Sequence, residues 1–227
     1  MPDELPLFPL GHAVLFPRVV LPLHVFEERY RELVRTLVAQ DDPGSRRFGV
    51  VAIRQGWEVG ADAVQALHAV GCAAELRRVS RYPDGRFDIV TVGSDRFRLL
   101  DIDHASKPYL VGRVEWLPGD PADGGEAALL VGGVGALFEE YAAAAAGLRG
   151  SALEPHELPE DPSVLSYLVA SSAVLTLQDR QVLLEAGTAA ARLRAELRLL
   201  KRETTMVRRL RALPVPVAEL QVTQSLS

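Results

Sequence analysis

The first half of the chain alternates short runs of β-forming residues with turn signals. Seven such runs predict strands: 5–10, 12–16, 48–53, 71–82, 86–92, 96–102 and 109–116. Asp84 and Gly85 separate two of the runs, and both residue types tolerate the positive φ angles of a two-residue hairpin turn. Residues 96–99 alternate charged and apolar side chains, as a half-buried antiparallel strand requires. We therefore predict a β-rich region over residues 1–118.

One amphipathic helix interrupts this region. Apolar residues recur there at intervals of three and four, which places them on one side of a helix. They are Phe26, Tyr30, Leu33, Val34, Leu37 and Val38. Residues 41–44, Asp-Asp-Pro-Gly, end the helix. A set of short strands with one helix across it favours an open or partly closed barrel.

The pattern changes near residue 118. Residues 119–125 are rich in Gly, Pro and Asp and predict a linker, and residues 126–213 predict a helical region. The first helix, 126–146, contains three glycines, each of which costs about 1 kcal/mol relative to alanine. The tail, 214–227, shows no packing pattern, and we expect it to be mobile.

Two helix starts inside this region have clear signals. Asp161 precedes Pro162, which suits an N-cap followed by proline at the first helical position. Thr176 precedes Asp179 by three residues, which resembles a capping box. Both patterns predict further helices in the second half of the chain.

Composition indicates a globular protein in the cytoplasm. The 227 residues are 48% hydrophobic and 24% charged, and the net charge of -5 argues against a polyanion as the main partner. Cys72 is the single cysteine, so an intrachain disulfide cannot form, and a reducing compartment is expected. Residues 1–10 lack the pattern of a secretory signal, and the apolar run 141–147 is too short to cross a membrane.

The sequence offers no recognisable catalytic, cofactor or metal motif. A phosphate-binding loop of the common type ends in Gly-Lys-Ser/Thr, but the two lysines, Lys107 and Lys201, follow Ser106 and Leu200. The five histidines are scattered, without the i, i+4 pair or the CxxC spacing of a zinc site. We therefore expect no enzyme activity, no cofactor and no metal, with Cys72 as a buried structural thiol.

The last predicted helix concentrates positive charge. Its cations are Arg192, Arg194, Arg198, Lys201, Arg202, Arg208, Arg209 and Arg211. One interpretation is pairing with the acidic residues that precede it, together with the helix dipole. The other is a phosphate-binding strip, although no aromatic residues interleave to stack bases.

Several ordered motifs resemble a known family. Residues 5–10 (LPLFPL), 14–17 (VLFP) and 21–30 (LPLHVFEERY) resemble the opening of the Lon-type protease substrate-binding domain in its stand-alone bacterial form. Residues 92–100 resemble the strand of that family in which glycine precedes Arg-Phe, and 175–185 resemble its helical half. The resemblance covers nearly the whole chain up to about residue 213.

This resemblance implies an α+β fold, in which a PUA-like pseudo-barrel is followed by a C-terminal helical bundle. It also implies recognition of protein substrates or partners. In full-length proteases an ATPase module and a serine–lysine peptidase follow, and this chain ends before either. We therefore expect a non-catalytic module that binds proteins or unfolded peptide segments and that is able to form a homodimer.

The resemblance defines no ligand residues, so the binding surface is inferred from four aromatic candidates. Phe26, Tyr30, Phe97 and Tyr109 are expected at the junction of the barrel with the helices, and the alternative is that all four are core residues. Two other functions stay open at this point. One is RNA binding, since PUA-like folds can serve it, and the other is an enzyme of unrecognised type.

Overall fold

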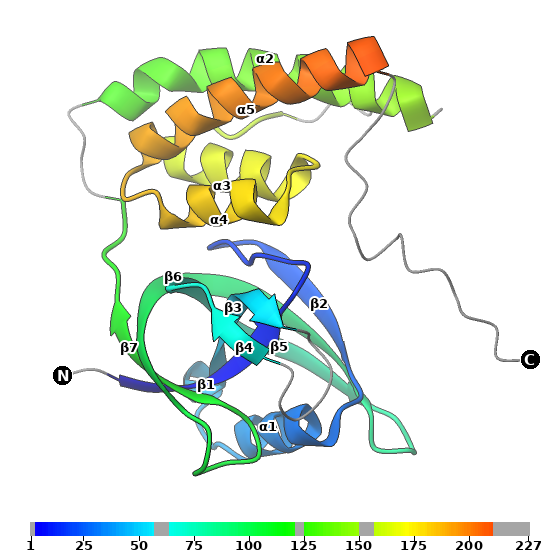
Figure 1. Ribbon diagram of the computed structural model, residues 1–227, viewed down its shortest axis with the longest axis vertical. Helices are drawn as coiled ribbons and strands as arrows, with labels where there is room; N and C mark the ends of the chain where they lie inside the picture. Colours follow the sequence, from blue (N-terminus) through cyan, green and yellow to red (C-terminus); the bar gives the residue numbers. More distant parts are fainter. Residues whose placement is uncertain (1–2, 57–63, 121–124, 150–156, 211–227) are drawn as a thin grey trace, which may run out of the picture. The chain divides into compact units, whose positions relative to one another are not determined.

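The computed structural model describes residues 3–56, 64–120, 125–149 and 157–210. The chain divides into two compact units, Met1–Pro121 and Ala122–Ser227 (Figure 1). The first unit is β-rich and the second is helical, which confirms the predicted α+β class. The division falls inside the predicted linker, 119–125, and the predicted tail, 214–227, lies outside the described residues.

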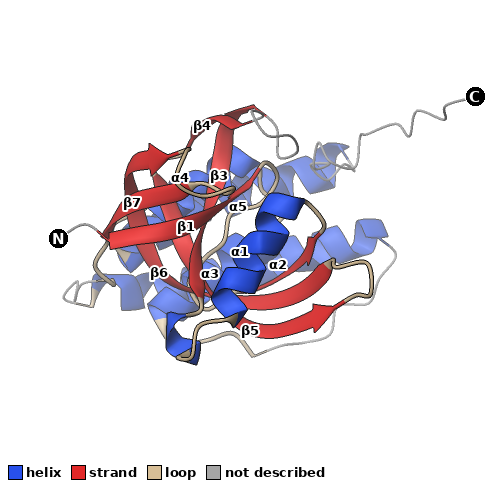
Figure 2. Ribbon diagram, turned by 90° about the horizontal axis from the view of Figure 1, so that it is seen from below, coloured by secondary structure: helices blue, strands red, loops and turns tan. Residues whose placement is uncertain are grey.

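The first unit is built on one curved sheet that nearly closes on itself (Figures 1 and 2). The strands follow the order β1-β7-β6-β5-β3-β4, and β1 also pairs in parallel with β3, which closes the ring. Strand β2 pairs with β6. The strand bounds are β1 Asp3–Leu10, β2 Val20–Val25, β3 Arg47–Gly56, β4 Val64–Leu67, β5 Val70–Arg81, β6 Phe87–Asp103 and β7 Val111–Trp116.

The inside of this ring is apolar. Its central cluster consists of Leu5, Leu7, Val51, Ala73, Phe97 and Val114. The ring of Trp116 meets Phe97 edge-on at 6.3 Å between centroids. Cys72 is fully buried, and burial raises the pKa of its thiol, as expected for a structural cysteine.

Two predictions about strands were wrong, and two strands, β2 and β4, were not predicted. Residues 12–16 form no strand, although Leu15 and Phe16 are buried. The runs 86–92 and 96–102 are one strand, β6, whose first half pairs with β2 and whose second half pairs with β7. Strand β2 was not predicted because it contains Pro22; proline lacks an N–H donor and is confined to edge strands.

Strand β6 passes the turn before β2 at Gly93. The amide of Arg18 donates to the carbonyl oxygen of Gly93 (2.7 Å), and the amide of Gly93 donates to that of Val19 (2.9 Å). A Cβ atom on Gly93 would lie 2.1 Å from the carbonyl oxygen of Phe16. Only glycine therefore allows this close approach of the two backbones.

Helix α1, Glu28–Val38, covers one end of the barrel (Figure 2). Its buried side chains, Tyr30, Leu33, Val34 and Leu37, confirm the predicted apolar side, whereas Phe26 and Val38 are exposed. A short 3₁₀ turn, Pro43–Ser45, follows the helix. Arg31 joins α1 to the β5–β6 hairpin, because its Nε donates to the carbonyl oxygen of Gly85 (2.8 Å).

The second unit contains four helices within its described residues: α2 Glu126–Arg149, α3 Pro162–Ser172, α4 Leu177–Glu185 and α5 Ala189–Leu210. Helix α5 packs against α2 and α3. The two predicted N-caps are confirmed: Asp161 accepts from the amide of Val164 (2.8 Å), and Thr176 accepts from that of Asp179 (3.1 Å).

Helix α2 is unusually apolar for its exposure. Over the described residues, Glu126–Leu148 is the one helix whose length and composition would allow it to cross a membrane, and only 22% of its most apolar window is buried. A single helix that meets these two criteria is weak evidence for a membrane span.

Candidate functional site

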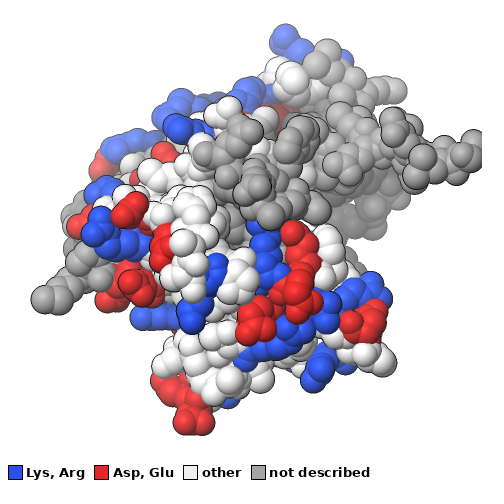
Figure 3. Space-filling view, turned by 60° about the horizontal axis from the view of Figure 1, so that its bottom comes forward, with Lys and Arg blue, Asp and Glu red and all other residues white. Residues whose placement is uncertain are grey.

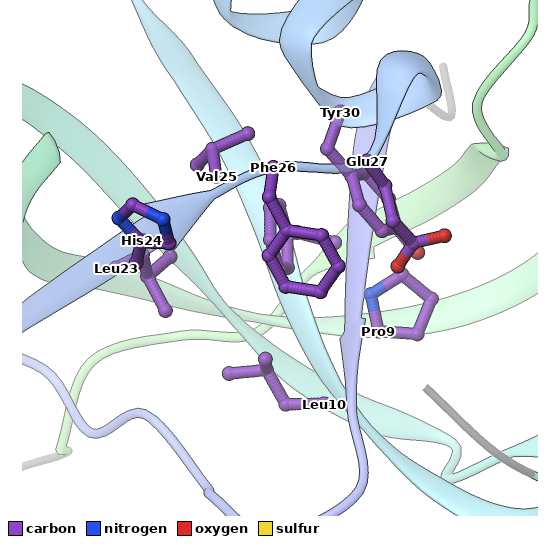
Figure 4. Close-up of a pocket in the computed structure, with 9 residues that line it drawn as sticks. Pro9, Leu10, Leu23, His24, Val25, Phe26, Glu27 and Tyr30 are labelled. Carbon is purple, nitrogen blue, oxygen red and sulfur yellow. The ribbon is translucent and has the colours of Figure 1, made fainter. Parts of the chain in front are cut away.

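An apolar pocket lies in the first unit, where the ends of β1 and β2 meet the start of α1 (Figure 4). Its volume is about 190 Å³. The lining residues are Phe8, Pro9, Leu10, Leu23, His24, Val25, Phe26, Glu27 and Tyr30. Stacking of Phe8 on Tyr30, with 4.2 Å between ring centroids, fixes the wall that β1 and α1 share.

Phe26 is the exposed aromatic residue of this pocket. Its side chain projects over the pocket in Figure 4, with His24 on one side and Pro9 on the other. The residue is 51% exposed, whereas Tyr30 in the same pocket is 4% exposed. A large aromatic side chain that leaves half its surface in water beside an apolar hollow is typical of a contact surface for another molecule.

Strand β2 extends this surface away from the pocket. Side chains alternate along a strand, so Val20, Pro22 and His24 share one side. All three are exposed, and Val20 is 58% exposed. Val25, on the opposite side, is buried in the barrel. We call the exposed residues Val20, Pro22, His24 and Phe26, together with the pocket, the β2 surface.

A polar cluster borders the β2 surface and holds His24 in place. Asp88 on β6 lies 2.6 Å from Nδ1 of His24 and accepts a 2.5 Å hydrogen bond from the hydroxyl of Tyr82. The His24 ring also stacks with Phe26, at 6.3 Å between centroids. Three aromatic side chains, Phe26, His24 and Tyr82, thus form one row. Strands β2 and β6 and the β5–β6 hairpin hold this row in position.

Hydrogen bonds within this cluster shift the pKa values of two of its groups. The hydrogen bonds from Tyr82 and His24 lower the pKa of the Asp88 carboxyl, and the same bond to Asp88 raises the pKa of the Tyr82 hydroxyl. Both shifts move the groups away from the pKa near 7 that a general acid or base needs. Asp88 thus holds the side chains of both His24 and Tyr82 in place.

The four residues predicted for binding are not all together. Phe26 and Tyr30 line the pocket, but Tyr30 is mostly buried. Phe97 is 0% exposed in the barrel core and Tyr109 is 4% exposed, and neither lines the pocket. The core alternative therefore describes Tyr30, Phe97 and Tyr109, and Phe26 is the candidate that remains at the surface.

Sequence reasoning missed Val20, Pro22 and Tyr82. Pro22 lies in the middle of residues 20–25, and proline argues against a strand there. The predicted strand 71–82 ends at Tyr82, before the hairpin turn. Its partner Asp88 lies six residues later, across the turn.

Several charged side chains of helices α5 and α1 form ion pairs. On α5, Arg194 pairs with Glu126, Arg202 with Asp179 (2.6 Å) and Arg208 with Glu140. On α1, Arg35 pairs with Glu28 (2.8 Å) and Glu32 (3.0 Å), and Figure 3 shows positive and negative side chains intermixed rather than segregated. The pair of Arg208 with Glu140 therefore confirms, for this cation, the interpretation that the α5 cations pair with acidic residues earlier in the chain.

Metal chemistry finds no support in the described part of the chain. Over those residues, no group of three or more His, Cys, Asp or Glu side chains is arranged to hold a metal ion. The histidine of the site, His24, faces a single carboxylate.

The arrangement of a near-closed β ring followed by helices matches two solved structures. A Lon N-terminal domain protein from Xanthomonas campestris superposes with a TM-score of 0.59 at 24% identity, over 88% of this chain and 98% of that one. The N-terminal domain of a Mycobacterium avium complex Lon protease gives 0.58 at 17% identity, over 89% and 98%. The chain therefore has the fold of Lon N-terminal domains.

Sequence comparison also identifies the family of the chain. The model of the ATP-dependent protease La (LON) substrate-binding domain matches residues 4–202, so the chain belongs to this family. It is 30% identical to Lon protease 1 of Thermus thermophilus over 88% of this chain, and 31% identical to Lon protease 2 of Syntrophobacter fumaroxidans over 82%. The matched part spans 25% and 22% of those relatives' own lengths.

Proposed function

We propose that the chain is a non-catalytic module that binds exposed apolar segments of other polypeptides on the β2 surface. The observation that carries the proposal is Phe26, half exposed over an apolar pocket. Membership of the substrate-binding family supports a polypeptide as the ligand.

The size of the pocket favours a side chain over a small molecule. Pockets for drug-sized ligands enclose roughly 300–1,000 Å³. The pocket under Phe26 encloses about 190 Å³ and has apolar walls. It fits one apolar side chain of a longer chain, and Val20 and Pro22 offer contacts to the residues that follow.

Substitution of Phe26 tests the proposal. We expect Phe26→Ala to weaken binding of a permanently unfolded, carboxymethylated polypeptide about tenfold or more, because a central aromatic residue contributes disproportionately to an interface. Fluorescence anisotropy of the labelled polypeptide measures the dissociation constant.

Leu100→Ala is the matched control, since Leu100 is an exposed apolar residue (46%) on the second half of β6, away from the pocket. Equal weakening by both substitutions, or none by Phe26→Ala, would contradict the β2 surface as the binding site.

We also propose a cytoplasmic location. A single buried cysteine is consistent with a reducing compartment. Fractionation of cells that express a tagged chain tests this, and recovery from the periplasm or medium would overturn it.

A further inference from the structure

We propose that the outer face of β2, β6 and β5 selects extended segments in which carboxylate side chains stand beside apolar ones, with Arg78 and Arg86 as their partners. The outer face is the side of these strands that carries Val20, Pro22 and His24. The inference rests on the proposed function, because it specifies which polypeptide segments the β2 surface prefers.

The strand register places the two kinds of side chain on one face. Pro22 on β2 lies opposite Val90 on β6, and Val90 lies opposite Arg78 on β5. Residues directly opposite each other in antiparallel strands share a face of the sheet. Arg78, Val90 and Pro22 thus form one row across the three strands.

The neighbouring rows complete an apolar floor. Val20 lies opposite Val92 in one row, and His24 lies opposite Asp88 in the other. Val20 and Pro22 are exposed, and Val90 and Val92 are half-buried. An extended segment that follows β2 toward Phe26 can cover these four side chains with its own apolar residues.

Most charges of the outer face already have partners. Glu75 pairs with Arg77 (2.5 Å), and both carboxyl oxygens of Asp88 are engaged by His24 and Tyr82. None of the ion pairs formed by the described residues includes Arg78, which is exposed. Arg78 is therefore a cation available to an incoming carboxylate.

Arg86 supplies the second cation at the other end of the face. Its Nη1 lies 3.4 Å from Nε2 of His24, and its guanidinium lies over the Tyr82 ring, which places it beside the aromatic row. Nε is held by Asp84 at 2.7 Å. A guanidinium has five N–H donors in a fixed fork, so Nη2 can still bind a carboxylate.

The spacing of the two cations suits an extended ligand. Arg78 is four residues before Tyr82, so their Cα atoms are roughly 13 Å apart at about 3.3 Å per residue. The guanidinium of Arg86 lies over the Tyr82 ring. In an extended segment, residues four apart also lie on the same side. This face therefore matches a ligand segment with acidic residues at positions i and i+4. These acidic residues lie on the same side of the segment as its apolar residues.

Three labelled peptides of equal length test the inference with the full chain. One alternates leucine and serine, the second carries aspartate at two positions four residues apart, and the third carries lysine at the same positions. Fluorescence anisotropy at low and moderate ionic strength gives the dissociation constants. We expect the aspartate peptide to bind about three- to tenfold tighter than the neutral peptide, because exposed ion pairs contribute modestly, and the lysine peptide to bind more weakly.

Charge reversal locates the effect. Arg78→Glu and Arg86→Glu should abolish the preference for the aspartate peptide over the neutral peptide. Arg54→Glu is the matched control, since Arg54 is an exposed arginine on β3. An equal loss of preference with Arg54→Glu would overturn the inference in favour of overall charge.

The other outcomes separate this inference from the function it rests on. Equal binding of all three peptides, abolished by Phe26→Ala, would overturn the charge selection and leave the proposed function standing. Failure of every peptide to bind would overturn both. Tighter binding of a single-stranded RNA than of the aspartate peptide, sensitive to Arg78→Glu, would assign this face to nucleic acid and overturn the inference.

Discussion

At the scale of single residues, Gly93 marks a close approach of two backbone segments in the first unit. The Phe16 carbonyl oxygen occupies the position that a side chain at residue 93 would need. The backbone of Gly93 is in contact with the backbone of Phe16, and a backbone cannot move aside as a side chain can. The fold around β2, and with it the candidate site, depends on this residue.

We expect Gly93→Ala to lower the free energy of unfolding of the first unit by about 2 kcal/mol or more, as overpacking does in well-packed interiors. Both tryptophans, Trp57 and Trp116, belong to that unit, so urea denaturation followed by tryptophan fluorescence reports on it. Gly119→Ala is the control, because nothing lies within 4 Å of the added methyl group. An unchanged denaturation midpoint for Gly93→Ala would contradict the described crossing.

Glu196 on α5 is the residue whose charge state should govern the second unit. It is 1% exposed, and neither carboxyl oxygen has a hydrogen-bond partner. Burial raises the pKa of Glu196 to about 9, and the nearby Arg192 opposes that shift only in part. Arg192 is itself engaged, since its Nε donates to Ser166 at 2.7 Å and its guanidinium lies over Tyr167.

The sign of the pH effect follows from this raised pKa. Between the ordinary carboxyl pKa and about 9, the unfolded chain has released the proton that the folded chain keeps, so stability falls as pH rises through this range. Glu196→Gln has no such proton to keep. At about pH 8 it should be more stable than the parent chain by about 1 kcal/mol or more, and near pH 4 the advantage should vanish.

Urea denaturation followed by far-UV circular dichroism, which is dominated by the helices, measures this difference. A parallel pH dependence for the two proteins would show that Glu196 is ionised in the folded chain, contrary to this account.

At the scale of elements, the sequence predicted those whose signals are local. The apolar spacing of α1 and the caps Asp161 and Thr176 lie within a few residues of the structures they specify. Strand β2 escaped prediction because what makes it a strand is pairing with β6, some 70 residues later, which tolerates Pro22 at an edge. The continuity of β6 through Gly93 likewise depends on partners on both of its sides.

The candidate site could be predicted only in part for the same reason. The residues next to Phe26, Phe97 and Tyr109 in the sequence do not show which of the three is exposed. Phe97 and Tyr109 are buried by strands distant in sequence, whereas Phe26, which precedes a helix, is exposed. The exposed side of β2 was not predictable without the strand. Arg78 and Val90 share a row with Pro22 only through the register of three strands.

At the scale of the whole molecule, the two units carry different features. The first unit carries the apolar pocket, the aromatic row, and Arg78 and Arg86 of the outer face. The second unit carries the paired arginines of α5 and a buried titratable group. The chain matches about a quarter of its Lon protease relatives' length, so recognition is the part of their activity that we propose for it.

The central claim is that polypeptides bind on the β2 surface, and backbone NMR chemical shifts test it most directly. An unlabelled, permanently unfolded polypeptide is added to the isotopically labelled chain, and the perturbed amides are located. We expect the largest changes on Val20–Val25, on Phe26 and on the first half of β6, residues 87–92. Changes confined to α2 and α5, or no changes at saturating polypeptide, would contradict it.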